Sequence, residues 1–69
     1  MNDKIKQYYG EKEALYANPE SYKNTTLMDK ELLSIANAIY AVYTTLENPT
    51  KEDTEAYNWA VKEKNWKWR

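Results

Sequence analysis

LLSIANAIYAVYTTL, residues 32–46, is the longest stretch of this 69-residue sequence without a charged side chain. On a helical wheel its apolar side chains cover more than half of the circumference, and only small or uncharged side chains lie opposite them. A helix with so broad an apolar surface is usually covered on two sides. The stretch is shorter than the roughly 20 apolar residues of a membrane-spanning helix. It therefore predicts the central helix of a small fold, or the seam of an oligomer.

Two Asn-Pro dipeptides, at 18–19 and 48–49, divide the chain on either side of this stretch. The residue before a proline avoids helical backbone angles, so each dipeptide indicates a break between helices. We expect helices at about residues 3–17, 28–47 and 51–66, with a short helical turn near 19–23. Three helices joined by short loops predict an all-α, three-helix bundle that forms one domain over residues 1–69.

The clearest start signal is Thr50 followed three residues later by Asp53, a variant of the capping box. For the other two long helices we expect caps from Asn2 or Asp3 and from Thr26 or Asp29. The first helix is amphipathic, although one lysine lies in its apolar stripe, which consists of Ile5, Tyr8, Tyr9, Lys12, Leu15 and Tyr16.

The composition excludes several chemistries. The chain has no cysteine and no histidine, which excludes disulfides, thiolate metal ligands, the common zinc sites and histidine-dependent catalytic triads. Its single glycine excludes a glycine-rich phosphate loop. The acidic clusters lie near predicted helix starts, where capping and the helix dipole explain them: Glu11/Glu13, Asp29/Glu31 and Glu52/Asp53/Glu55. We therefore expect no enzyme activity, no cofactor and no metal site.

Charge is unevenly distributed along the chain. Residues 62–69, KEKNWKWR, contain three lysines and one arginine against one glutamate, a net charge of +3. Since the whole chain carries −1, residues 1–61 carry −4. Acids at the start and bases at the end of the last helix complement its dipole, which is an ordinary structural reason for the asymmetry.

The tryptophans near the C-terminal end are harder to place in a small core. Trp59 and Trp66 share one face of the last helix, and the opposite face carries Tyr57, Ala60, Val61 and Trp68. A bundle of three helices can bury one of these stripes. The other is then partly exposed, covered by a folded-back tail, or covered by another chain. The residues that we predict to bind a partner are Trp59, Lys62, Trp66, Lys67, Trp68 and Arg69.

These observations favour a non-enzymatic protein-interaction module, an inhibitor or adaptor that binds a host protein through this aromatic and basic surface. Its lysine-, asparagine- and tyrosine-rich composition fits a bacteriophage or mobile element with an A/T-rich genome. One alternative is a structural homo-oligomer assembled through the central helix. Another is weak nucleic-acid binding by the C-terminal tail, which the three acids in residues 51–55 disfavour for a helix-turn-helix. We expect a cytoplasmic protein without a membrane partner, because no signal-peptide pattern follows the N-terminal lysines.

Overall fold

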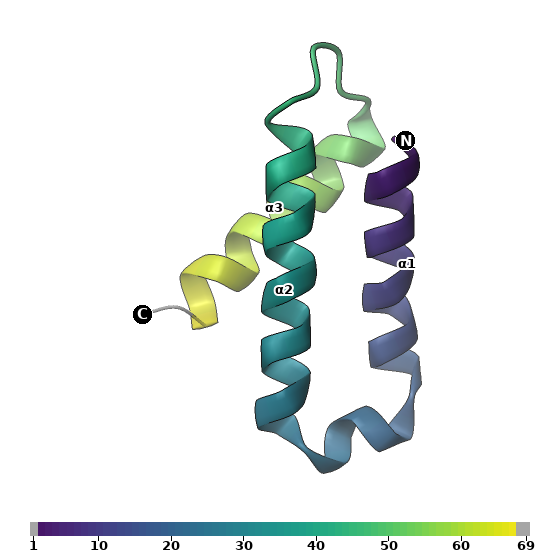
Figure 1. Ribbon diagram of the computed structural model, residues 1–69, viewed down its shortest axis with the longest axis vertical. Coiled ribbons are helices and arrows are strands. Elements are labelled where there is room, and N and C mark those ends of the chain that lie inside the picture. The colour runs from purple at the N-terminus through teal and green to yellow at the C-terminus, as the bar shows by residue number, and fades with distance from the viewer. Residues whose placement is uncertain (1, 68–69) are drawn as a thin grey trace.

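A computed structural model describes residues 2–67 of the chain, with side chains through Asn65. It contains α1 (Asp3–Ala17), the short 3-10 helix η1 (Pro19–Lys23), α2 (Thr25–Tyr43) and α3 (Lys51–Lys67). Helices α1 and α2 lie antiparallel, and α3 crosses behind α2 at an oblique angle (Figure 1). The predicted all-α, three-helix architecture is confirmed, including the short helical turn between the first two long helices.

Helix α2 is the central element, as its broad apolar surface predicts. Both α1 and α3 pack mainly against α2, and they meet each other over a much smaller area. The buried apolar side chains come from all three long helices: Ile5, Met28, Leu32, Ile35, Ala36, Ile39, Ala56 and Ala60. The core is therefore one thin layer on either side of α2.

The start of α1 agrees with the sequence. The Asn2 side-chain oxygen accepts hydrogen bonds from the backbone N–H groups of Lys4, at 2.9 Å, and Ile5, at 3.3 Å. These bonds satisfy two of the N–H groups that the first turn of a helix leaves without a partner. Asn2 is thus one of the two caps expected for this helix.

The expected bounds of the second helix were wrong at both ends. Its cap is Asn24, whose side-chain oxygen accepts from the Leu27 N–H at 3.0 Å, and not Thr26 or Asp29. The helix ends at Tyr43, where the backbone hydrogen bonds change from the i to i−4 pattern of an α-helix to the i to i−3 pattern of a turn. The Leu46 N–H, for example, donates to the Tyr43 carbonyl at 3.0 Å. The Thr44 and Thr45 hydroxyls also donate to backbone carbonyls three residues earlier, which competes with continued helix.

The predicted capping box of α3 is present. The Asp53 N–H donates to the Thr50 hydroxyl at 3.2 Å, and the Thr50 N–H donates to one Asp53 carboxylate oxygen at 3.0 Å. The other oxygen accepts from the backbone N–H of Asn2 at 2.8 Å, although Asn2 lies at the other end of the chain. Asp53 is only 2% exposed. One carboxylate therefore joins the starts of α1 and α3.

The buried apolar side chains of α3, as far as the structure describes them, are small, although the sequence allowed one aromatic stripe to be fully buried. Ala56 and Ala60 are both fully buried, whereas Tyr57 and Trp59 are only half-buried. Tyr57 stacks on Tyr43 with ring centroids 4.2 Å apart. Trp59 packs against α1 on the other flank of α3. The alanines allow the α3 backbone to approach α2 closely, so the larger rings lie beside the contact line.

Candidate functional site

The structure describes only part of the surface that the sequence predicts to bind a partner. Trp59 is half-buried and Lys62 is exposed. Trp66 and Lys67 belong to the last turn of α3, but their side chains lie outside the described part, as do Trp68 and Arg69 altogether. The predicted face shared by Trp59 and Trp66 therefore stays a prediction.

The Trp59 ring packs against α1 in an aromatic cluster around Lys12. The Trp59 ring meets the Tyr9 ring edge-on, with centroids 6.4 Å apart. The Lys12 ammonium lies 3.9 Å from the centroid of Tyr9, 5.1 Å from that of Trp59 and 5.7 Å from that of Tyr16. Lys12 is only 8% exposed. The lysine in the apolar stripe of α1 is thus accommodated by cation–π contacts that join α1 to α3.

Lys12→Met is expected to lower the free energy of unfolding by about 0.5–2 kcal/mol, because methionine keeps most of the apolar contact but loses the cation–π attraction. The ion pair of Lys12 with the exposed Glu13, at 3.4 Å, adds little to this loss. The matched control is Lys6→Met, at an exposed position of the same helix. Urea denaturation followed by circular dichroism measures both variants. A Lys12→Met protein as stable as wild type would show that the ammonium contributes nothing.

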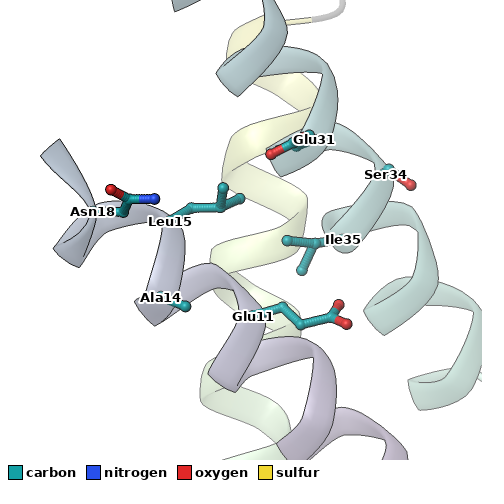
Figure 2. A pocket seen from close by; sticks show the side chains of 7 residues that line it. All are labelled: Glu11, Ala14, Leu15, Asn18, Glu31, Ser34 and Ile35. Atoms are coloured by element: carbon teal, nitrogen blue, oxygen red, sulfur yellow. The ribbon is translucent and has the colours of Figure 1, made fainter. Parts of the chain in front are cut away.

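A second surface, which is not among the predicted site residues, is a groove between α1 and α2. It is a hollow of about 400 Å³. Leu15 from α1 and Ile35 from α2 point toward each other and form its apolar floor, and the carboxylates of Glu11 and Glu31 stand at its sides (Figure 2). We call this the α1–α2 groove and define it by its lining residues, which are Glu11, Ala14, Leu15, Asn18, Glu31, Ser34 and Ile35.

The two helices contribute the same pattern to the groove. In α1 a glutamate is followed by a small residue three positions later and an apolar residue four positions later, as Glu11, Ala14 and Leu15. In α2 the corresponding residues are Glu31, Ser34 and Ile35. Side chains at these spacings lie on one face of a helix. Because the small residues do not fill the space between the helices, a hollow remains, and each helix supplies one carboxylate to it.

The groove continues toward η1 at the turn between α1 and α2. An adjoining hollow of about 260 Å³ shares the groove residues Leu15, Asn18 and Glu31 and extends to Leu27 and Met28. Leu27 is a large apolar side chain that is 53% exposed. Apolar surface therefore runs from the floor of the α1–α2 groove to the end of the helix pair where η1 connects the two helices.

Neither groove carboxylate forms an ion pair with any side chain of residues 2–65. Both glutamates are exposed to solvent. An apolar floor with an unpaired carboxylate from each helix suits a ligand that combines an apolar group with positive charges. The sequence contained the signal, the repeated pattern on two helices, but showing that the two copies face each other required the antiparallel packing of α1 and α2.

Other classes of site were sought over the same residues. The described part of the chain contains no group of three or more acidic side chains placed to hold a metal ion. No helix within residues 2–67 has both the length and the hydropathy needed to cross a membrane.

Comparison with known proteins gives no relatives. No protein-family model, no curated protein and no solved structure matches this chain.

Proposed function

We propose that this chain is a small, non-enzymatic protein-interaction module, in which three helices form a scaffold for binding surfaces. The observation that supports this most is the α1–α2 groove, with its apolar floor of Leu15 and Ile35 and the unpaired carboxylates of Glu11 and Glu31. Peptide-binding modules commonly accept the apolar face of an amphipathic helix in such a groove. The matching ligand is a segment with a large apolar side chain flanked by lysine or arginine.

The C-terminal surface stays part of the proposal as a second binding surface. Its members are Trp59, Lys62, Trp66, Lys67, Trp68 and Arg69, and tryptophan and arginine are enriched among the residues that dominate binding energy. A chain with one acidic groove and one basic, aromatic end fits an inhibitor or adaptor that acts by covering a partner's surface. We place this role in the cytoplasm and attribute the chain to a bacteriophage or mobile element on its composition alone.

Ala14→Trp is expected to block the groove, because Ala14 is an exposed lining residue and an indole at this position fills the hollow. The probe is a short, fluorescently labelled amphipathic peptide of leucine and lysine, and fluorescence anisotropy measures its binding. We expect wild type to bind this peptide and Ala14→Trp to bind it about tenfold more weakly or worse, a loss of roughly 1.4 kcal/mol.

The matched control is Ala17→Trp, which adds the same indole to the same helix at an exposed position outside the groove. It should bind the peptide as wild type does. A second peptide with glutamate in place of lysine should not bind, because its charges repel Glu11 and Glu31. Equal binding by wild type and both tryptophan variants would show that the peptide binds elsewhere, and the groove would no longer support the proposed function.

A further inference from the structure

The C-terminal part of the chain has the chemistry that the α1–α2 groove lacks. Residues 62–69 carry a net charge of +3 in a chain whose total is −1. Within them, Lys62, Trp66 and Arg69 follow one another at i, i+4 and i+7, the sequence spacing of one helix face. We propose that this face of a second copy of the chain docks in the α1–α2 groove. The inference rests on the proposed function of the groove and names its occupant.

The order of groups on the two surfaces is complementary. In the groove, the apolar floor of Leu15 and Ile35 has the Glu31 carboxylate on one side and that of Glu11 on the other (Figure 2). In the sequence of the C-terminal segment, Trp66 comes between Lys62 and Arg69. The indole buries its apolar area on the floor, and each cation forms a charge-assisted contact with one carboxylate.

Lys62 of the same copy forms no ion pair with Glu11 or Glu31. The groove is lined by side chains of α1, of Asn18 just after it, and of α2. Helix α3 crosses behind α2 and its later turns run away from α1 (Figure 1). Lys62 is an exposed side chain of α3, so it is free to contact the groove of a different copy, as we propose.

The resulting contact is head-to-tail, because the groove of one copy binds the C-terminal face of the next. Such a heterologous contact leaves one free groove and one free face on every pair, so it continues into rings or open chains. A symmetric dimer that packs α2 against α2 would instead stop at two copies. The charged contacts of the head-to-tail arrangement are screened by salt, so association should weaken as the ionic strength rises.

The experiment measures mass by light scattering after size exclusion, over a range of concentrations at low ionic strength. Three variants of the full chain are compared with wild type. The groove variant is Glu11→Lys with Glu31→Lys, and the face variant is Lys62→Glu with Arg69→Glu. The control variant, Glu47→Lys with Glu52→Lys, has the net charge of the groove variant but changes exposed glutamates outside the groove.

We expect the mass of wild type and of the control variant to rise with concentration, and the groove and face variants each to stay monomeric. Mixing these two variants should restore association, because each then meets a groove and a face of opposite charge. When the groove variant or the face variant is measured alone, we expect its apparent dissociation constant for self-association to be at least tenfold higher than that of wild type. Circular dichroism verifies that all variants keep their helical content.

Two results would overturn the inference. Wild type that stays monomeric at every concentration excludes the second copy as occupant, and so does a groove variant that associates as well as wild type. The lysine and leucine peptide separates this failure from that of the proposed function. If wild type binds that peptide in the groove but does not self-associate, the occupant belongs to another protein and the groove keeps its function.

Discussion

Ile39→Ala is expected to lower the free energy of unfolding by about 2–5 kcal/mol, the largest effect of any single substitution considered for this chain. Ile39 is 0% exposed and belongs to the buried cluster that also contains Ile5 of α1 and Ala56 and Ala60 of α3. Removing three carbons leaves a cavity in a cluster that contains three alanines, whose short side chains cannot fill it. Urea denaturation followed by circular dichroism measures the loss.

Two further variants make this prediction testable even if Ile39→Ala is largely unfolded. A domain of this length has a total stability of roughly 3–10 kcal/mol, so a loss of that size removes much of it. Ile39→Val should cost about 0.5–1.5 kcal/mol and leave a folded protein. Leu27→Ala removes a similar side chain from a position that is 53% exposed, and should cost much less. Equal losses at positions 27 and 39 would contradict the core assignment.

Asp53→Ala is expected to cost about 1–3 kcal/mol, which corresponds to a fall in melting temperature of roughly 5–20 °C for a domain of this size. The carboxylate accepts hydrogen bonds from the N–H groups of Thr50, at 3.0 Å, and Asn2, at 2.8 Å. Alanine leaves both donors without this acceptor and removes the tie between the starts of α1 and α3. Glu52→Ala, an exposed acid in the same turn, is the control and should change the melting temperature little.

The contribution of Asp53 should also depend on pH. Burial by itself raises the pKa of this carboxyl, but the hydrogen bonds from Thr50 and Asn2 outweigh it and hold the pKa below its ordinary value of 3.8. The unfolded chain therefore takes up this proton at a higher pH than the folded chain does. The stabilisation is complete above pH 3.8 and is lost as the pH falls through the lower, folded pKa.

Denaturation of wild type and Asp53→Asn at neutral and acidic pH measures this dependence. Asparagine keeps the size of the side chain but has no charge and only one acceptor oxygen. The stability difference between the two proteins should be large at pH 7 and shrink in acid below the ordinary pKa of the carboxyl. A difference that stays constant over this range would show that the charge of Asp53 does not contribute.

The two candidate surfaces differ in how far the sequence predicts them. Helix starts do not explain the carboxylates of the groove, because Glu11 lies in the third turn of α1 and Glu31 in the second turn of α2. Their role in one groove depends on the contact between α1 and α2, which local spacing does not contain. Composition and helical periodicity predict the C-terminal surface, and of its predicted members only Trp59 and Lys62 have described side chains.

The sequence by itself determined which segments form helices and which helix lies at the centre. The Asn-Pro dipeptides, the Thr50 and Asp53 capping box and the charge-free stretch at 32–46 act through local backbone preferences and through one helix's own apolar surface. Each of these signals can be read from a segment of about a dozen residues, without knowledge of the rest of the chain. They lead to the correct architecture even where a cap is assigned to the wrong residue.

Only the tertiary structure decided which side chains of those helices meet. It placed Ala56 and Ala60, and not Trp59, on the buried face of α3. It brought the Asp53 carboxylate to the first turn of α1 and put two similar Glu-containing patterns on opposite sides of one groove. Each outcome depends on the distance and angle between helices, which are determined by close packing of the whole core and are not encoded in any single segment.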